Sequence, residues 1–173
     1  WSAFNNPFTD NVNRFFGNAN LVYEPLDWLT VSYRLGTDVY SDQRKQIFAI
    51  GAWDPANAPG GEIYENKQNF RQVYGDLAIT ATRQLTDDIG ASLTVGNNIW
   101  QQNFKDLFSR GRDLTIPGFY NLSNATDLYA SEATTFERST ALFANLDLDW
   151  KSTLFLNGTL RNEWYSTFGV NNS

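Results

Sequence analysis

The chain has 173 residues, a formal net charge of -6, and neither Cys nor His. The sequence therefore offers no disulfide, no thiolate or imidazole ligand for a metal, and no Cys/His or Ser/His nucleophile, which disfavours an enzyme and gives no sign of a cofactor. The acidic balance also argues against a nucleic-acid partner, because binding to a phosphate backbone relies on Lys and Arg.

The chain contains no Met, so Trp1 cannot be a natural start and we expect a piece of a longer protein. Aromatic residues make up 16% of the sequence, yet no uncharged apolar run approaches the roughly 20 residues that a membrane helix needs. These facts fit either a soluble β protein or a membrane barrel whose strands are apolar on one face only.

The first predicted element is a hairpin. Between Trp28 and Tyr40, apolar and polar residues alternate with a period of two, as in a strand with two different faces. The preceding segment, Arg14 to Tyr23, alternates in the same way, and the link around Pro25 is short and turn-like. At about 3.3 Å per residue the second strand would span about 43 Å, which suits a membrane crossing better than a soluble sheet.

Two further hairpins follow. Residues 72–82 and 89–99 alternate on either side of a turn at Asp87, and residues 142–149 and 154–161 alternate on either side of a turn near Lys151. The pattern thus predicts about six antiparallel strands. A six-stranded open sheet leaves two bare edges, so we expect further strands to close a barrel.

The links between hairpins are much longer than the turns within them. They cover residues 41–68 and 101–134, and compact soluble domains rarely contain such long links. Outer-membrane barrels alternate short periplasmic turns with longer extracellular loops, and this asymmetry predicts the orientation of the strands. Aromatic residues near the strand ends would form two interfacial girdles, although aromatics also favour strand ends and cores in general. The proposed girdle residues are Tyr23, Trp28 and Trp150 at the short turns and Tyr40, Trp100, Trp164 and Tyr165 at the long loops.

Few residues suggest chemistry. The close carboxylate pairs, Asp87 with Asp88 and Asp147 with Asp149, sit in or beside turns, where Asp is favoured for its hydrogen bonds to the backbone. Aromatic residues in the long loops are better candidates, because exposed rings beside polar groups bind sugars or peptides. The alternative is that they pack against one another and order the loops. The candidates for contact with a ligand or a lid are Trp53, Tyr64, Phe119 and Tyr120.

Several segments resemble the barrel of SusC/RagA-type TonB-linked outer-membrane transporters of the Bacteroidota. They are NPFTDN at 6–11, YEPLDWLT at 23–30, YRLG at 33–36, IPGFYNL at 116–122 and LFLNGTLRNEW at 154–164. The family often has Asp in place of Glu163, and commonly Ser-Ser-Thr where this chain has Tyr165-Ser166-Thr167. The resemblance covers nearly the whole chain.

The resemblance implies that residues 1–173 are part of a TonB-dependent-receptor barrel domain of 22 strands, without its plug. It also implies uptake of glycans or peptides across the bacterial outer membrane, with a SusD-like lipoprotein lid and the TonB complex as partners and membrane lipid around the barrel. Two alternatives from the residues are a small structural or adhesin barrel and a soluble β-sandwich that binds carbohydrate.

Overall fold

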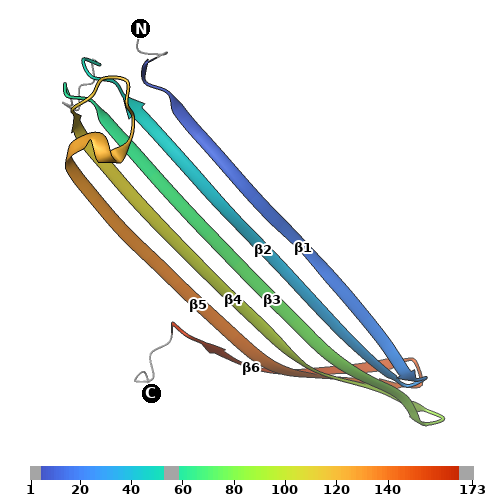
Figure 1. Cartoon of the computed structure of the whole chain (residues 1–173). Coiled ribbons are helices and arrows are strands. Elements are labelled where there is room, and N and C mark those ends of the chain that lie inside the picture. Colours follow the sequence, from blue (N-terminus) through green and yellow to red (C-terminus); the bar gives the residue numbers. More distant parts are fainter. Residues whose placement is uncertain (1–4, 53–58, 168–173) are drawn as a thin grey trace. The chain divides into compact units, whose positions relative to one another are not determined.

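The computed structural model describes residues 5–52 and 59–167. Its elements in chain order are β1 (Phe8–Leu26), β2 (Leu29–Phe48), β3 (Glu62–Thr86), β4 (Ile89–Leu114), the 3-10 turn η1 (Leu122–Asn124), β5 (Ala125–Trp150) and β6 (Leu154–Tyr165). The strands form one sheet in the order β1-β2-β3-β4-β5-β6, so each strand pairs with its neighbours in sequence (Figure 1). The predicted fold class, an all-β antiparallel up-and-down sheet, is confirmed.

The chain divides along its strands into two compact units. Unit 1 comprises Trp1–Phe15, Val39–Arg71 and Asn103–Thr135, and unit 2 comprises Phe16–Asp38, Gln72–Gln102 and Phe136–Ser173. Both longer connections, residues 49–61 and 115–124, belong to unit 1, whereas all three short turns belong to unit 2. The predicted alternation of short and long connections is therefore confirmed.

The short turns explain the carboxylate pairs. Lys151 and Ser152 have φ angles of 52° and 50°, a left-handed conformation that costs energy for residues other than glycine. Asp149 offsets this cost, because its Oδ1 accepts a hydrogen bond of 2.8 Å from the backbone N–H of Ser152. The backbone N–H of Lys151 donates to the carbonyl of Asp88 at 2.8 Å, which ties two turns together. Asp149 therefore stabilises a turn, as the sequence suggested, whereas Asp147 accepts hydrogen bonds from the side chains of Asn145 and Asn157.

One face of unit 2 is apolar and exposed. Its side chains include Leu93 on β4, 45% exposed, and Leu160 on β6, 77% exposed. The register of β5 with β6 places Leu148 opposite Leu156 and Ala144 opposite Leu160 on this face. An apolar surface of this extent requires an apolar environment or a partner.

The other face of unit 2 is polar and internally bonded. Asn98 donates to Asp76 at 2.8 Å and accepts from Arg161 at 2.6 Å, while the hydroxyls of Thr80 and Thr94 lie 2.9 Å apart. These bonds join β3, β4 and β6 through side chains as well as backbone. Within residues 5–52 and 59–167, no helix has both the length and the apolar character required to cross a membrane.

The strands extend well beyond their predicted ends, so the predicted long links were too long. β3 begins at Glu62 and β4 continues to Leu114, although residues 62–68 and 101–114 lack alternating apolar residues. Backbone pairing between the strands continues there although apolar and polar residues no longer alternate. The periodicity of apolar residues therefore does not predict where these strands end. Tyr40, expected in an interfacial girdle at a strand end, lies inside β2 and stacks on Phe70 with ring centroids 5.0 Å apart.

Gly96 is required by close packing on the polar face of unit 2. A Cβ at this position would lie 2.5 Å from the carbonyl oxygen of Leu77 and would also run into the ring of Phe143. We expect Gly96→Ala to lower the free energy of unfolding by about 1 to 3 kcal/mol, because the backbone cannot give way cheaply. Urea unfolding followed by tryptophan fluorescence measures this change.

The matched control is Gly158→Ala in β6, where an added Cβ meets no atom within 4 Å. That variant should be as stable as the parent chain or slightly more stable, since alanine restricts the unfolded state. Equal stability of the two variants would contradict the packing role of Gly96.

Candidate functional site

A row of four aromatic rings crosses four strands of unit 1. Phe48 contacts Tyr64 edge to face with centroids 6.1 Å apart, Tyr64 contacts Phe108 at 5.9 Å, and Phe108 contacts Tyr129 at 6.2 Å. The rings come from β2, β3, β4 and β5, one from each strand. Cross-strand aromatic neighbours of this kind stabilise a sheet and present a continuous surface of ring edges and faces. We call these four residues the aromatic row.

A hollow of about 330 Å³ lies beside the aromatic row, lined by Phe8, Arg44, Gln46, Tyr64, Asn66, Gln68 and Phe108. Two of its polar side chains are held in place. The guanidinium of Arg44 donates to Asp42 at 2.6 Å, and the amide of Asn66 donates to Asp106 at 2.9 Å. The hollow therefore combines rings for stacking with amides and one guanidinium for hydrogen bonds, which suits a peptide or an oligosaccharide.

A buried carboxylate orders one end of the row. Glu62 is fully buried, and its Oε1 accepts a hydrogen bond from Nε of Arg112 and lies 3.8 Å from Nε of Arg110. The guanidinium of Arg110 in turn lies 5.5 Å from the ring centre of Tyr129. A buried charge is stable only when it is paired, and here two cations share one carboxylate.

The buried carboxylate of Glu62 also changes the pKa of Tyr64 in the aromatic row. Burial raises the pKa of Tyr64 above its ordinary value, and its hydrogen bond with Glu62 raises the pKa further, whereas Arg112 works in the opposite direction. The hydrogen bond to Glu62 likewise raises the pKa of Arg112. At neutral pH the phenol is therefore a neutral donor and Arg112 a fixed cation.

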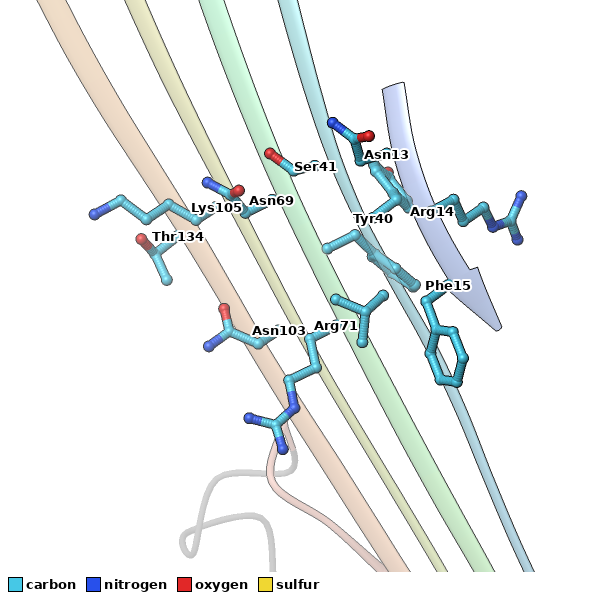
Figure 2. Close-up of a pocket in the computed structure, with 12 residues that line it drawn as sticks. Asn13, Arg14, Phe15, Tyr40, Ser41, Asn69, Arg71, Asn103, Lys105 and Thr134 are labelled. Atoms are coloured by element: carbon cyan, nitrogen blue, oxygen red, sulfur yellow. The ribbon is translucent and has the colours of Figure 1, made fainter. Parts of the chain in front are cut away.

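Unit 1 also contains a larger hollow, of about 720 Å³, which is lined by side chains of strands β1 to β5 (Figure 2). We call it the large hollow. Arg71 and Asn69 of β3 line it together with Asn103 and Lys105 of β4. Asn69 and Arg71 alternate with Phe70, so their side chains point to the opposite face of β3 from the stacked rings of Tyr40 and Phe70.

The connection between β4 and β5 is ordered by one asparagine. The side chain of Asn124 donates to the carbonyls of Ile116 and Phe119, at 2.9 and 2.7 Å, and accepts from the N–H of Ile116 at 2.9 Å. Asn124 is buried, so its side chain serves the structure of this connection. Lys45 fixes the loop to β2, because its ammonium donates to the carbonyl of Tyr120 at 2.9 Å.

Three of the four predicted contact residues lie in the described part of the chain, and the structure places them in two different segments. Tyr64 lies in β3 rather than in a loop and belongs to the aromatic row, whereas Phe119 and Tyr120 lie in the connection between β4 and β5. Trp53 falls outside the described residues. The sequence did not reveal the pairing of Glu62 with Arg112. The alternation along β3 and β4, continued past its apolar part, would have placed Tyr64 and Phe108 on one face.

No metal site accompanies these groups. Among residues 5–52 and 59–167, no three Asp or Glu side chains are arranged to hold a metal ion. The rings, amides and charged side chains described above offer binding by stacking, hydrogen bonds and ion pairs.

Glu62 should be more important for stability than an exposed acid of the same unit. Its Oε2 has no hydrogen-bond partner among the described residues, so Glu62→Gln removes the charge while the amide oxygen can still accept from Arg112. We expect a loss of about 1 to 3 kcal/mol in the free energy of unfolding, because two cations lose their shared anion.

The control is Glu132→Gln, which breaks the exposed ion pair of Glu132 with Lys105 at 2.9 Å. Exposed pairs contribute little, so this variant should change stability by no more than about 0.5 kcal/mol. Denaturant titration of both variants compares them, and similar losses would show that Glu62 has no special structural role.

Comparison with known proteins identifies the fold. No protein-family model matches the chain, and no curated protein matches it in sequence. Among solved structures, the RagAB peptide transporter matches with a TM-score of 0.87 and 14% identity. The RagAB peptide importer matches in its closed-closed state, at 0.86 and 14%, and in its open-open state, at 0.83 and 15%.

Each match covers 98% of this chain and 19% of the matched chain, so the chain spans about a fifth of the length of these structures. At this level of identity the likeness establishes the fold. The six-stranded sheet has the architecture of a segment of a transporter chain.

Proposed function

We propose that the chain is part of the wall of an outer-membrane importer that takes up peptides or oligosaccharides with energy from TonB. The observation that carries this proposal is the exposed apolar face of unit 2 on strands whose fold matches a segment of the RagAB chains. The function is transport and not catalysis, in keeping with the transporter neighbours.

Strand length supports a membrane location. Strands β1 to β5 contain 19, 20, 25, 26 and 26 residues, and β6 contains 12. A tilted strand crosses a bilayer with roughly 9 to 11 residues, so each strand is long enough and five are much longer. The apolar face of unit 2 supplies the lipid contact, and the polar ends of the strands extend out of the membrane.

Side-chain alternation along β3 and β4 supports a position of the aromatic row in the proposed lumen. Along β3, Tyr64 and Asp76 lie an even number of positions apart, and so do Phe108 and Asn98 along β4. The rings therefore share the polar face of their strands and point away from lipid. Substrate would stack on them and bond to Arg44, Asn66 and Gln68, which line the adjoining hollow.

The partners follow from the family resemblance and from the orientation of the connections. A SusD-like surface lipoprotein would cover the end of the barrel at residues 49–61 and 115–124, where Trp53, Phe119 and Tyr120 are the proposed contacts. The TonB complex would act through parts of the transporter outside this sheet. A β-sandwich module is disfavoured, because the described strands form one sheet and not two.

The lipid assignment predicts a contrast between adjacent residues. Leu93→Arg places a charge on the apolar face and should lower the free energy of folding into lipid by about 2 to 4 kcal/mol. Thr94→Arg on the opposite face loses only its hydrogen bond with Thr80, worth about 1 kcal/mol. Refolding into vesicles from urea measures both, and an equal cost at the two positions would refute the assignment.

Transport itself is tested by uptake of labelled peptides and oligosaccharides into cells that carry the protein. We expect Tyr64→Ala combined with Phe108→Ala to reduce uptake of the substrate at least about tenfold, since stacked rings supply much of the contact. Leu107→Ala is the control, because it shortens the neighbouring side chain on the other face of β4. Unchanged uptake in the double variant, with normal amounts in the outer membrane, would exclude the aromatic row from the substrate path.

A further inference from the structure

The large hollow of unit 1 is amphipathic. Phe15, which is 68% exposed, and Val39, which is 38% exposed, line it. Two residues further along the same face of each strand stand Asn13 on β1 and Ser41 on β2, which also line it. A ligand of this hollow would therefore meet apolar side chains at one end and polar groups at the other.

The polar part is positively charged, although the whole chain is acidic. Figure 2 shows Arg71, Asn103 and Lys105 extending to the same side of β3 and β4. Among residues 5–52 and 59–167, no carboxylate pairs with Arg71, whereas Lys105 lies 2.9 Å from Glu132. Lys67 lies on the same face of β3 as Asn69 and Arg71 and lines a separate hollow of about 550 Å³ in unit 1. The three cations Arg71, Lys105 and Lys67 outnumber the two carboxylates beside them, Glu132 and Glu65.

The remaining groups are suited to hydroxyls. Three amides, from Asn13, Asn69 and Asn103, and two hydroxyls, from Ser41 and Thr134, line the same hollow. Each amide is both donor and acceptor, so the set can bond sugar hydroxyls in either direction. The hollow thus offers cations for phosphate, amides for a sugar and apolar side chains for an acyl chain.

We propose that this hollow binds the phosphorylated sugar headgroup of an outer-leaflet glycolipid. Arg71 and Lys105 each contact a phosphate of the headgroup, the amides contact the sugar, and Phe15 and Val39 contact the start of the acyl chains. The proposal rests on the proposed function, because it requires an outer-membrane location. A phospholipid would leave the amides without a sugar, and free phosphate would leave the apolar side chains unused.

The test is a binding titration of the purified full-length protein in a detergent without a sugar headgroup. The probes are diphosphorylated lipid A, its dephosphorylated form, phosphatidylglycerol and inorganic phosphate. We expect diphosphorylated lipid A to bind most tightly. The double variant Arg71→Gln/Lys105→Gln should weaken its binding about tenfold or more, as charge-assisted contacts to phosphate are lost.

Two further variants make the test specific. Arg83→Gln/Lys151→Gln removes the same two charge types from outside the hollow and should leave lipid A binding within twofold of the parent protein. Glu132→Gln frees Lys105 from its competing carboxylate and should tighten binding about two- to fivefold, a gain that general loss of structure cannot produce.

The results distinguish failure of the lipid site from failure of the import proposal. Equal binding of lipid A to parent and double variant overturns the site, and so does phosphatidylglycerol or inorganic phosphate binding as tightly as lipid A. Binding in detergent does not depend on transport. Failure of substrate uptake with the expected lipid pattern would therefore overturn only the import proposal, and normal uptake without the lipid pattern would overturn only this one.

Discussion

The structure depends on a two-residue alternation sustained along antiparallel strands, because it gives unit 2 two faces of opposite character. On one face, Leu93 and Leu160 are exposed with no second layer over them among the described residues. On the other, Asp76, Asn98 and Arg161 bond to one another. A soluble sheet would bury its apolar face and hydrate the polar one. Here the apolar face has no covering layer among the described residues, as the proposed position between lipid and water would require.

In unit 1 the same strands are held together by different interactions. Its residues lack the apolar period, and its strands are held by cross-strand rings and paired charges. Glu62 is buried between Arg110 and Arg112, and Tyr64, which bonds to it, packs against the ring of Phe108. Such contacts position side chains more rigidly than a mobile loop would, so a substrate would meet a surface that is already in place. Asn124 gives the connection between β4 and β5 a comparable order.

The two faces of unit 1 suggest two different binding roles. The rings and the adjoining hollow suit a substrate in the lumen, and the cationic hollow at Arg71 and Lys105 suits the headgroup layer outside. Binding a glycolipid there would fix the depth of the strands in the membrane, much as interfacial aromatic residues do in other barrels. Tyr40 does not serve that purpose, because it stacks on Phe70 on the opposite face.

The sequence by itself determined the strand number, the three short turns and the direction of each face, because a period of two in apolar residues has one structural interpretation over such lengths. It could not determine where the strands end, since residues 62–68 and 101–114 continue the ladder without a regular alternation of apolar side chains. Only the tertiary structure decided which side chains meet. Glu62 and Arg112 are 50 positions apart, and nothing local to either residue indicates that pairing across two strands brings their charges together.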